Sequence, residues 1–196
     1  MKKLLYFLKK ISFILVILIP IEKTMSQDIE HLPFSKLPKF EESYKASSVA
    51  KRVIQGLGFR YYWATEGLTD KDLAFKPNAA ARSSVETINH ILDLSQVILN
   101  ATLKVANGAK KTEMTFAQKR KKTLENLQQA GKILKESKDI AQYKMIFGEK
   151  EFPFWNAING PIADAIWHVG QVVSFRRSSG NPINPKINHL SGTIKE

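Results

Sequence analysis

The sequence contains no cysteine among its 196 residues. This absence excludes disulfide bonds, a cysteine nucleophile and a lipid-modified cysteine anchor, so the stability of the fold must come from packing. The sequence also lacks a glycine-rich phosphate-binding loop, a G-x-S-x-G elbow and an H-E-x-x-H motif, which excludes the enzyme classes that these motifs identify. Internal repeats, low-complexity tracts and long linkers are missing as well, which favours a single domain.

The first 26 residues have the layout of a secretory signal peptide. Lysines come first, an apolar run follows from Ile11 to Ile21, and small or polar residues lead to Ser26. Lysines before the run and Pro20 within it leave too few apolar residues for a membrane span, which needs roughly 20. We expect cleavage after Ser26, a periplasmic or secreted protein and no membrane contact afterwards. The alternative is a membrane anchor formed by the uncleaved segment.

Basic residues outnumber acidic ones, 30 Lys and Arg against 18 Asp and Glu. Removal of the leader, which holds five lysines and one glutamate, leaves 25 basic and 17 acidic residues. The run Q-K-R-K-K at residues 118–122, near Lys110 and Lys111, is a candidate footprint for nucleic acid or anionic lipid. It wraps around a helix instead of following one face, and an exported protein meets little nucleic acid. We therefore interpret it as a solvated surface and expect no nucleic-acid partner.

The rest of the chain is a series of helical patterns. We expect an extended N-terminal arm at residues 27–47, a helical domain at 48–182 and a C-terminal tail at 183–196. The predicted helices run at about 48–67, 83–107, 115–136 and 154–180. Ser83 with Glu86 and Thr115 with Gln118 have the spacing of capping boxes, and Thr69 can cap a short helical turn before Pro77. Period-2 alternation is almost absent, so the sequence predicts an all-α, up-and-down four-helix bundle.

The last predicted helix carries an unusual polar pair in the stretch D-A-I-W-H-V-G-Q-V-V-S-F-R-R. Asp164 and His168 lie one turn apart, so their side chains can point at a common atom. His90 lies at the edge of the apolar face of the second predicted helix. Together the three residues could form a 2-His-1-carboxylate metal site with open coordination positions. The alternative is a structural network of hydrogen bonds or ion pairs.

Two stretches carry a resemblance to a known family. The stretch L-T-D-K-D-L-A-F-K-P-N-A-A-A-R-S-S-V-E-T-I-N-H-I-L-D-L and the later D-A-I-W-H-V-G-Q-V-V-S-F-R-R resemble the DinB-like superfamily of metal-binding four-helix bundles, over about residues 48–182. That family includes thiol-dependent S-transferases. It holds its metal through a histidine on the second helix and an H-x-x-x-H pair on the last, followed by x-G-Q. The resemblance implies that His90 and His168 are ligands, with Asp164 at the position of the middle histidine, and it matches Gly170 and Gln171.

The resemblance implies a divalent transition metal (zinc, iron, manganese or nickel) and a hydrolase or group transferase acting on a small molecule. The scarcity of thiol cofactors outside the cytoplasm disfavours thiol transfer for an exported protein, but it does not disfavour hydrolysis. Asp164 is a normal, harder ligand. It could also mark a degenerate site in a non-catalytic bundle that binds a small ligand or a protein partner.

Several other residues have two interpretations each. Gln171 could orient a ligand or substrate or be an ordinary rim residue, and Glu86 could assist the site, although its capping role already explains it. Gly160 would leave room above the site and Phe175 would close it below. Aromatic residues could line a pocket but are more often core; they are Tyr61, Tyr62, Trp63, Trp155 and Trp167. We do not expect His31 or His189 to be ligands, and apolar helix faces could pair two copies into a homodimer.

Overall fold

The computed structural model describes residues 31–108 and 112–195, and the predicted signal peptide lies outside these residues. The described part is predominantly helical with a few short strands, which is compatible with the predicted all-α class. None of its helices is both long and apolar enough to cross a membrane.

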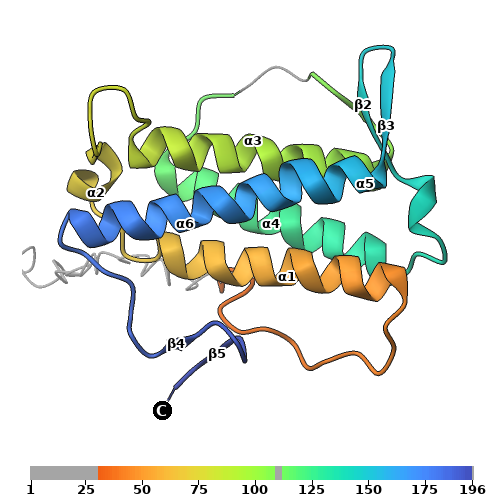
Figure 1. Cartoon of the computed structure of the whole chain (residues 1–196), viewed down its shortest axis with the longest axis horizontal. Helices are drawn as coiled ribbons and strands as arrows, with labels where there is room; N and C mark the ends of the chain where they lie inside the picture. The colour runs from red at the N-terminus through yellow and green to blue at the C-terminus, as the bar shows by residue number, and fades with distance from the viewer. Residues whose placement is uncertain (1–30, 109–111, 196) are drawn as a thin grey trace, which may run out of the picture. The chain divides into compact units, whose positions relative to one another are not determined.

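Four long helices enclose the core: α1 (Ala46–Thr65), α3 (Ser84–Leu103), α4 (Phe116–Lys135) and α6 (Ala163–Ser178). Both α1 and α3 pack against α4 and α6, so each long helix has two long neighbours (Figure 1). Each helix contributes buried aliphatic side chains to the common core, among them Ile54, Leu57, Ile88, Ile91, Leu124, Leu127, Val169 and Val172. Removal of these side chains from water is the main favourable term in folding.

Three helices begin at side-chain caps that the sequence predicts. In α3 the Ser83 backbone N–H donates to Glu86 Oε2 at 2.7 Å, and the Ser83 hydroxyl accepts from the Glu86 N–H. Thr115 and Gln118 make the same reciprocal pair at the start of α4. Thr69 caps the short helix α2 (Asp70–Ala74). These caps satisfy backbone donors that a helix leaves unpaired in its first turn.

The predicted end of the second helix at Asn107 is wrong. Helix α3 stops at Leu103 because Lys104 adopts a left-handed backbone conformation with φ of 59°. Beyond it β1 (Ala106–Asn107) pairs in parallel with β2 (Lys144–Phe147). The short 3₁₀ turn η1 (Ile140–Gln142) precedes β2.

The prediction that strands are almost absent is also wrong for residues 144–153. Strand β2 forms an antiparallel hairpin with β3 (Lys150–Pro153). Gly148, with φ of +59°, occupies the first position of the two-residue turn, where a positive φ favours glycine. The tail likewise contains a small hairpin of β4 (Ile187–Asn188) and β5 (Thr193–Ile194).

The last predicted helix is one helical run in three parts. Helix α5 (Phe154–Ala157) leads into a π-helical turn, η2 (Ile158–Ile162), and then into α6. The residues at both junctions keep right-handed helical dihedrals. Pro161 lies inside the π-helical turn, and it has no N–H to donate to a preceding carbonyl group.

Polar contacts join the C-terminal end of α6 to the ends of α1 and α2. The Arg176 guanidinium is buried and donates to the carbonyl groups of Trp63 and Ala64 at the end of α1 and to that of Glu66, which follows the helix. The Asp72 carboxylate accepts hydrogen bonds from Ser179 and Asn181. The hydrogen bonds from Arg176 satisfy carbonyl groups that the C-terminus of α1 leaves unpaired.

The described part of the predicted arm contacts helix α1 and the C-terminal tail. It has no helix or strand before α1, which begins at Ala46. The Phe34 ring lies so close to Gly58 of α1 that a side-chain carbon at position 58 would collide with it. The Leu37 N–H donates to the Gly192 carbonyl oxygen at 2.9 Å, which ties the arm to the tail.

Candidate metal centre

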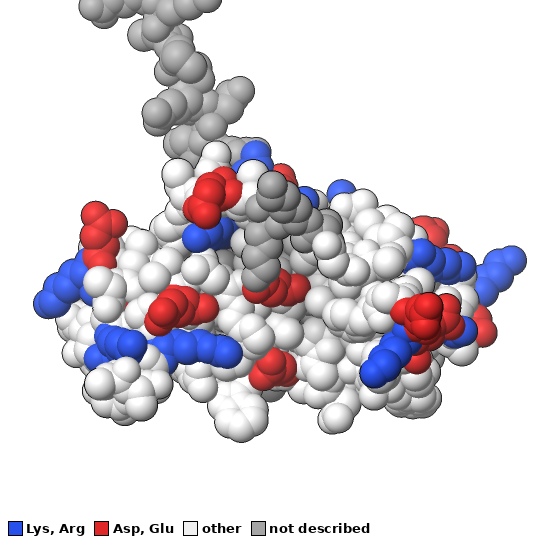
Figure 2. Space-filling view, turned by 90° about the horizontal axis from the view of Figure 1, so that it is seen from above, with Lys and Arg blue, Asp and Glu red and all other residues white. Residues whose placement is uncertain are grey.

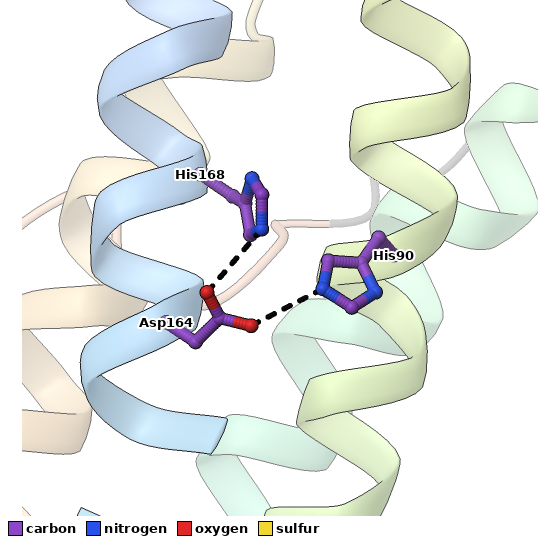
Figure 3. Close-up of side chains that lie close together, drawn as sticks. All are labelled: His90, Asp164 and His168. Carbon is purple, nitrogen blue, oxygen red and sulfur yellow. Dashed lines mark hydrogen bonds and ion pairs between the residues drawn. The ribbon is translucent and has the colours of Figure 1, made fainter. Parts of the chain in front are cut away.

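The structure brings together the three residues that the sequence singled out. Asp164 and His168 lie one turn apart on α6, and the packing of α3 against α6 places His90 opposite them (Figure 3). One ligand atom from each residue lies within 4.8 Å of the other two. Sequence spacing could predict the pair on α6, whereas the approach of His90 depends on how the two helices pack.

Each oxygen of the Asp164 carboxylate faces one imidazole. His90 Nε2 lies 3.2 Å from Oδ2, and His168 Nε2 lies 3.3 Å from Oδ1. The two rings meet edge to face, with centroids 4.6 Å apart. Charge-assisted hydrogen bonds are shorter, about 2.7–2.9 Å. The two separations are longer than that but within the range of an ion pair, and each involves a different carboxylate oxygen, so they bring the three side chains together without fixing the position of an ion.

Gln171 contacts the other nitrogen of His168. Nδ1 of His168 and the side-chain oxygen Oε1 of Gln171 are 2.8 Å apart. A metal-binding histidine commonly donates its second ring N–H to an oxygen in this way, which leaves the opposite nitrogen for the ion. The contact shows which ring nitrogen Gln171 faces, and its role toward a ligand or substrate stays a prediction.

The centre is partly open to solvent. The exposed fractions of the side chains are 14% for His168, 30% for His90 and 39% for Asp164. Apart from its chain neighbours and the nearby backbone of its own helix, no heavy atom would lie within 4 Å of a side-chain carbon added at Gly160, which agrees with the room expected there. Phe175 packs on Phe75, with ring centroids 6.0 Å apart. Part of each of the three side chains is therefore exposed to solvent.

No family model, curated protein or solved structure matches this chain. The likeness to DinB-like proteins therefore depends on the two motif stretches alone.

The carboxylate of Glu86 belongs to the cap of α3. It accepts hydrogen bonds from the Ser83 backbone N–H and hydroxyl, and these bonds hold the pKa of Glu86 below its ordinary value. His189 packs its ring against Phe59, at 5.9 Å between centroids. Within the described part of the chain, neither His31 nor His189 joins the group of possible ligands.

The aromatic residues do not form one pocket. Tyr61 is fully buried in the core, which confirms the core interpretation for that residue. Trp63 donates its indole N–H to the Ser35 carbonyl oxygen. Trp155 and Trp167 are 76% and 72% exposed. The buried Tyr61 and the two largely exposed tryptophans therefore do not line one cavity together.

The basic run at residues 118–122 is partly engaged within the fold. Arg120 pairs with Glu66 and lies over the Tyr62 ring, and Lys121 pairs with Glu125. On the face seen in Figure 2, basic and acidic side chains are interspersed and do not gather by sign. The interpretation of residues 118–122 as a solvated surface stays a prediction.

Proposed function

We propose that this chain is a DinB-like, up-and-down four-helix bundle that binds one divalent transition metal ion through His90, Asp164 and His168. Its function would be that of an exported hydrolase or group transferase acting on a small molecule. The observation that carries the proposal is the convergence of two imidazole nitrogens and a carboxylate at 3.2 and 3.3 Å. The motif resemblance and the contact between His168 and Gln171 support it.

The residues present suit the expected metals. Imidazole nitrogen binds zinc, iron and nickel well, and a carboxylate extends the range to manganese. When bound, such an ion would act as a Lewis acid that lowers the pKa of a water molecule or a thiol. Three protein ligands leave positions open for reactants, as catalytic metal sites require.

The chain's own residues have separate roles in this proposal. His90 ties α3 to the site, and Asp164 and His168 supply two donors from a single turn of α6. The oxygen of Gln171 holds the ring of His168. Partial exposure of His90 and Asp164 leaves the small-molecule substrate a route to the centre.

The test is elemental analysis of the untagged full chain, purified without chelators. We expect close to one equivalent of a transition metal in the wild type. His90→Ala and Asp164→Ala should both lose it because each removes one of three ligands. His189→Ala is the matched control and should keep its metal, since His189 lies outside the group of ligands.

One result would contradict the metal proposal. Wild-type protein could be purified without metal and stay empty when incubated with zinc, iron, manganese or nickel. In that case the three residues form a structural network in a non-catalytic bundle, and binding of a small ligand or a protein partner becomes the function to test.

A further inference from the structure

A groove lies between the N-terminal arm and the first turns of α1. Residues of the arm at 39–44 and of α1 at 48–55 line it, whereas the three possible metal ligands lie on α3 and α6. The groove has a volume of about 220 Å³ and is open to solvent on one side. Sites for drug-sized ligands have volumes of about 300–1,000 Å³, so this groove suits a small molecule better than a protein segment.

Two contacts hold the arm against α1 beside the groove. Arg52 Nη1 donates to the Pro38 carbonyl oxygen at 3.0 Å, and Lys51 forms an ion pair with Glu41. Later residues of the arm thus contact earlier residues of α1, and the arm runs back along the helix (Figure 1). Both sides of the groove therefore belong to the folded structure.

Exposed apolar side chains face each other across the groove. Phe40 and Tyr44 of the arm are 80% and 93% exposed, and Val49 and Val53 of α1 are 47% and 41% exposed. The two valines lie one turn apart and so share one side of the helix. Apolar surface gathered in one place and bordered by polar residues is typical of a binding site.

The charges around the groove favour an anion. Arg52 and Lys39 line it, and the one acidic residue of the lining, Glu41, pairs with Lys51 outside the lining. The Arg52 guanidinium lies 4.9 Å from the centroid of the Phe40 ring. Within the described part of the chain, Arg52 makes its hydrogen bonds through Nη1. A guanidinium has five N–H donors, so Nε and Nη2 can still donate to an anion.

We infer that this groove binds a small aromatic anion, an apolar ring system that carries one carboxylate or sulfonate group. The rings would lie between the aromatic residues of the arm and the two valines of α1, and the anionic group would accept hydrogen bonds from Arg52. The net charge of the chain, +12, disfavours a second copy as the occupant, because two such chains repel each other. The inference does not depend on the metal site.

The test compares two fluorescent probes that share the same rings, titrated into the full chain. 1-Anilinonaphthalene-8-sulfonate carries the anionic group, and N-phenyl-1-naphthylamine lacks it. We expect the wild type to bind the sulfonate probe more tightly. Arg52→Met should weaken binding of the sulfonate probe about 10-fold, the usual effect of losing a charge-assisted hydrogen bond, and should change binding of the uncharged probe less than about twofold. Arg82→Met, at an exposed arginine outside the lining, is the matched control.

A second variant tests the apolar side of the groove. Val53→Asn replaces an exposed valine with a polar side chain of similar size, so it should weaken binding of both probes about 5- to 10-fold. The melting temperatures of the variants should stay near that of the wild type because the changed side chains are on the surface. Equal melting temperatures separate a loss of the groove from a loss of structure.

Three results would overturn the inference. Arg52→Met could bind the sulfonate probe as tightly as the wild type, which would mean that Arg52 holds no anion. Val53→Asn could bind both probes unchanged, which would place them elsewhere on the chain. The wild type could bind neither probe and sediment as a dimer that Val53→Asn converts to a monomer, in which case a second copy of the chain occupies the groove.

Discussion

Among the described carboxyl groups, that of Asp72 has the pKa shifted furthest from its ordinary value. It is 1% exposed. Burial opposes its ionisation, but hydrogen bonds from Ser179, Asn181 and Thr69 outweigh that effect and hold its pKa well below the ordinary value of 3.8. A carboxylate whose pKa is lower in the folded than in the unfolded state stabilises the fold above the unfolded pKa. That contribution is lost as the pH falls from about 4 toward the folded pKa.

We predict that Asp72→Asn lowers the free energy of unfolding by about 1–3 kcal/mol at neutral pH, the usual effect of losing buried hydrogen bonds to a charged group. The variant should also lose part of the decline in stability that the wild type shows below about pH 4. Urea unfolding between pH 7 and pH 3 measures both effects. Asp70→Asn, an exposed neighbour on α2, is the control and should follow the wild type. Equal pH profiles for the two variants would contradict the assignment.

At the scale of elements, the sequence predicted what depends on a few neighbouring residues. The caps at Ser83, Thr69 and Thr115 were predictable because each needs one partner three residues away. The end of α3 was not, because a left-handed lysine at position 104 has no sequence signature comparable to glycine. The hairpin at residues 144–153 was missed because only one buried side chain, Met145, marks strand β2.

The same distinction holds for the candidate site. Asp164 and His168 could be paired from spacing alone, since both lie on one helix face. The position of His90 beside them needed the packing of α3 on α6, which no local pattern specifies. Gln171 was recognised as a candidate, but its contact with Nδ1 rather than with a substrate required the side-chain geometry.

The termination of α3 gives a second prediction. Lys104 is a non-glycine residue at φ of 59°, a conformation that costs an L-residue about 1–2 kcal/mol. Its exposed side chain contacts Gln142 and lies over the ring of the buried Tyr143, and contacts of an exposed charged side chain contribute about 0.2–1 kcal/mol. Lys104→Gly should therefore raise the free energy of unfolding by about 0.5–1 kcal/mol. Lys135→Gly, at the last residue of α4, should lower it by a similar amount. Urea unfolding of both variants checks the prediction, and a loss in both would count against a strained Lys104.

At the scale of the whole molecule, the candidate centre connects two helices that are far apart in the sequence. His90 comes from α3, and its two partners come from α6. An ion held there would cross-link the two elements only in the folded state, because the unfolded chain does not hold the three ligands together. Binding of the metal should then raise the free energy of unfolding of the whole molecule.

We therefore predict that a chelator destabilises the wild type and leaves His168→Ala unchanged. With free metal at 100 times the dissociation constant, binding adds about 2.7 kcal/mol to the free energy of unfolding. Removal of the ion with a chelator should abolish that amount and lower the melting temperature. His168→Ala, which lacks one ligand, should melt at the same temperature with and without the chelator. If the three residues form only a polar network, the chelator will change neither protein, while His168→Ala will still be less stable than the wild type because it leaves the Asp164 carboxylate with one partner fewer.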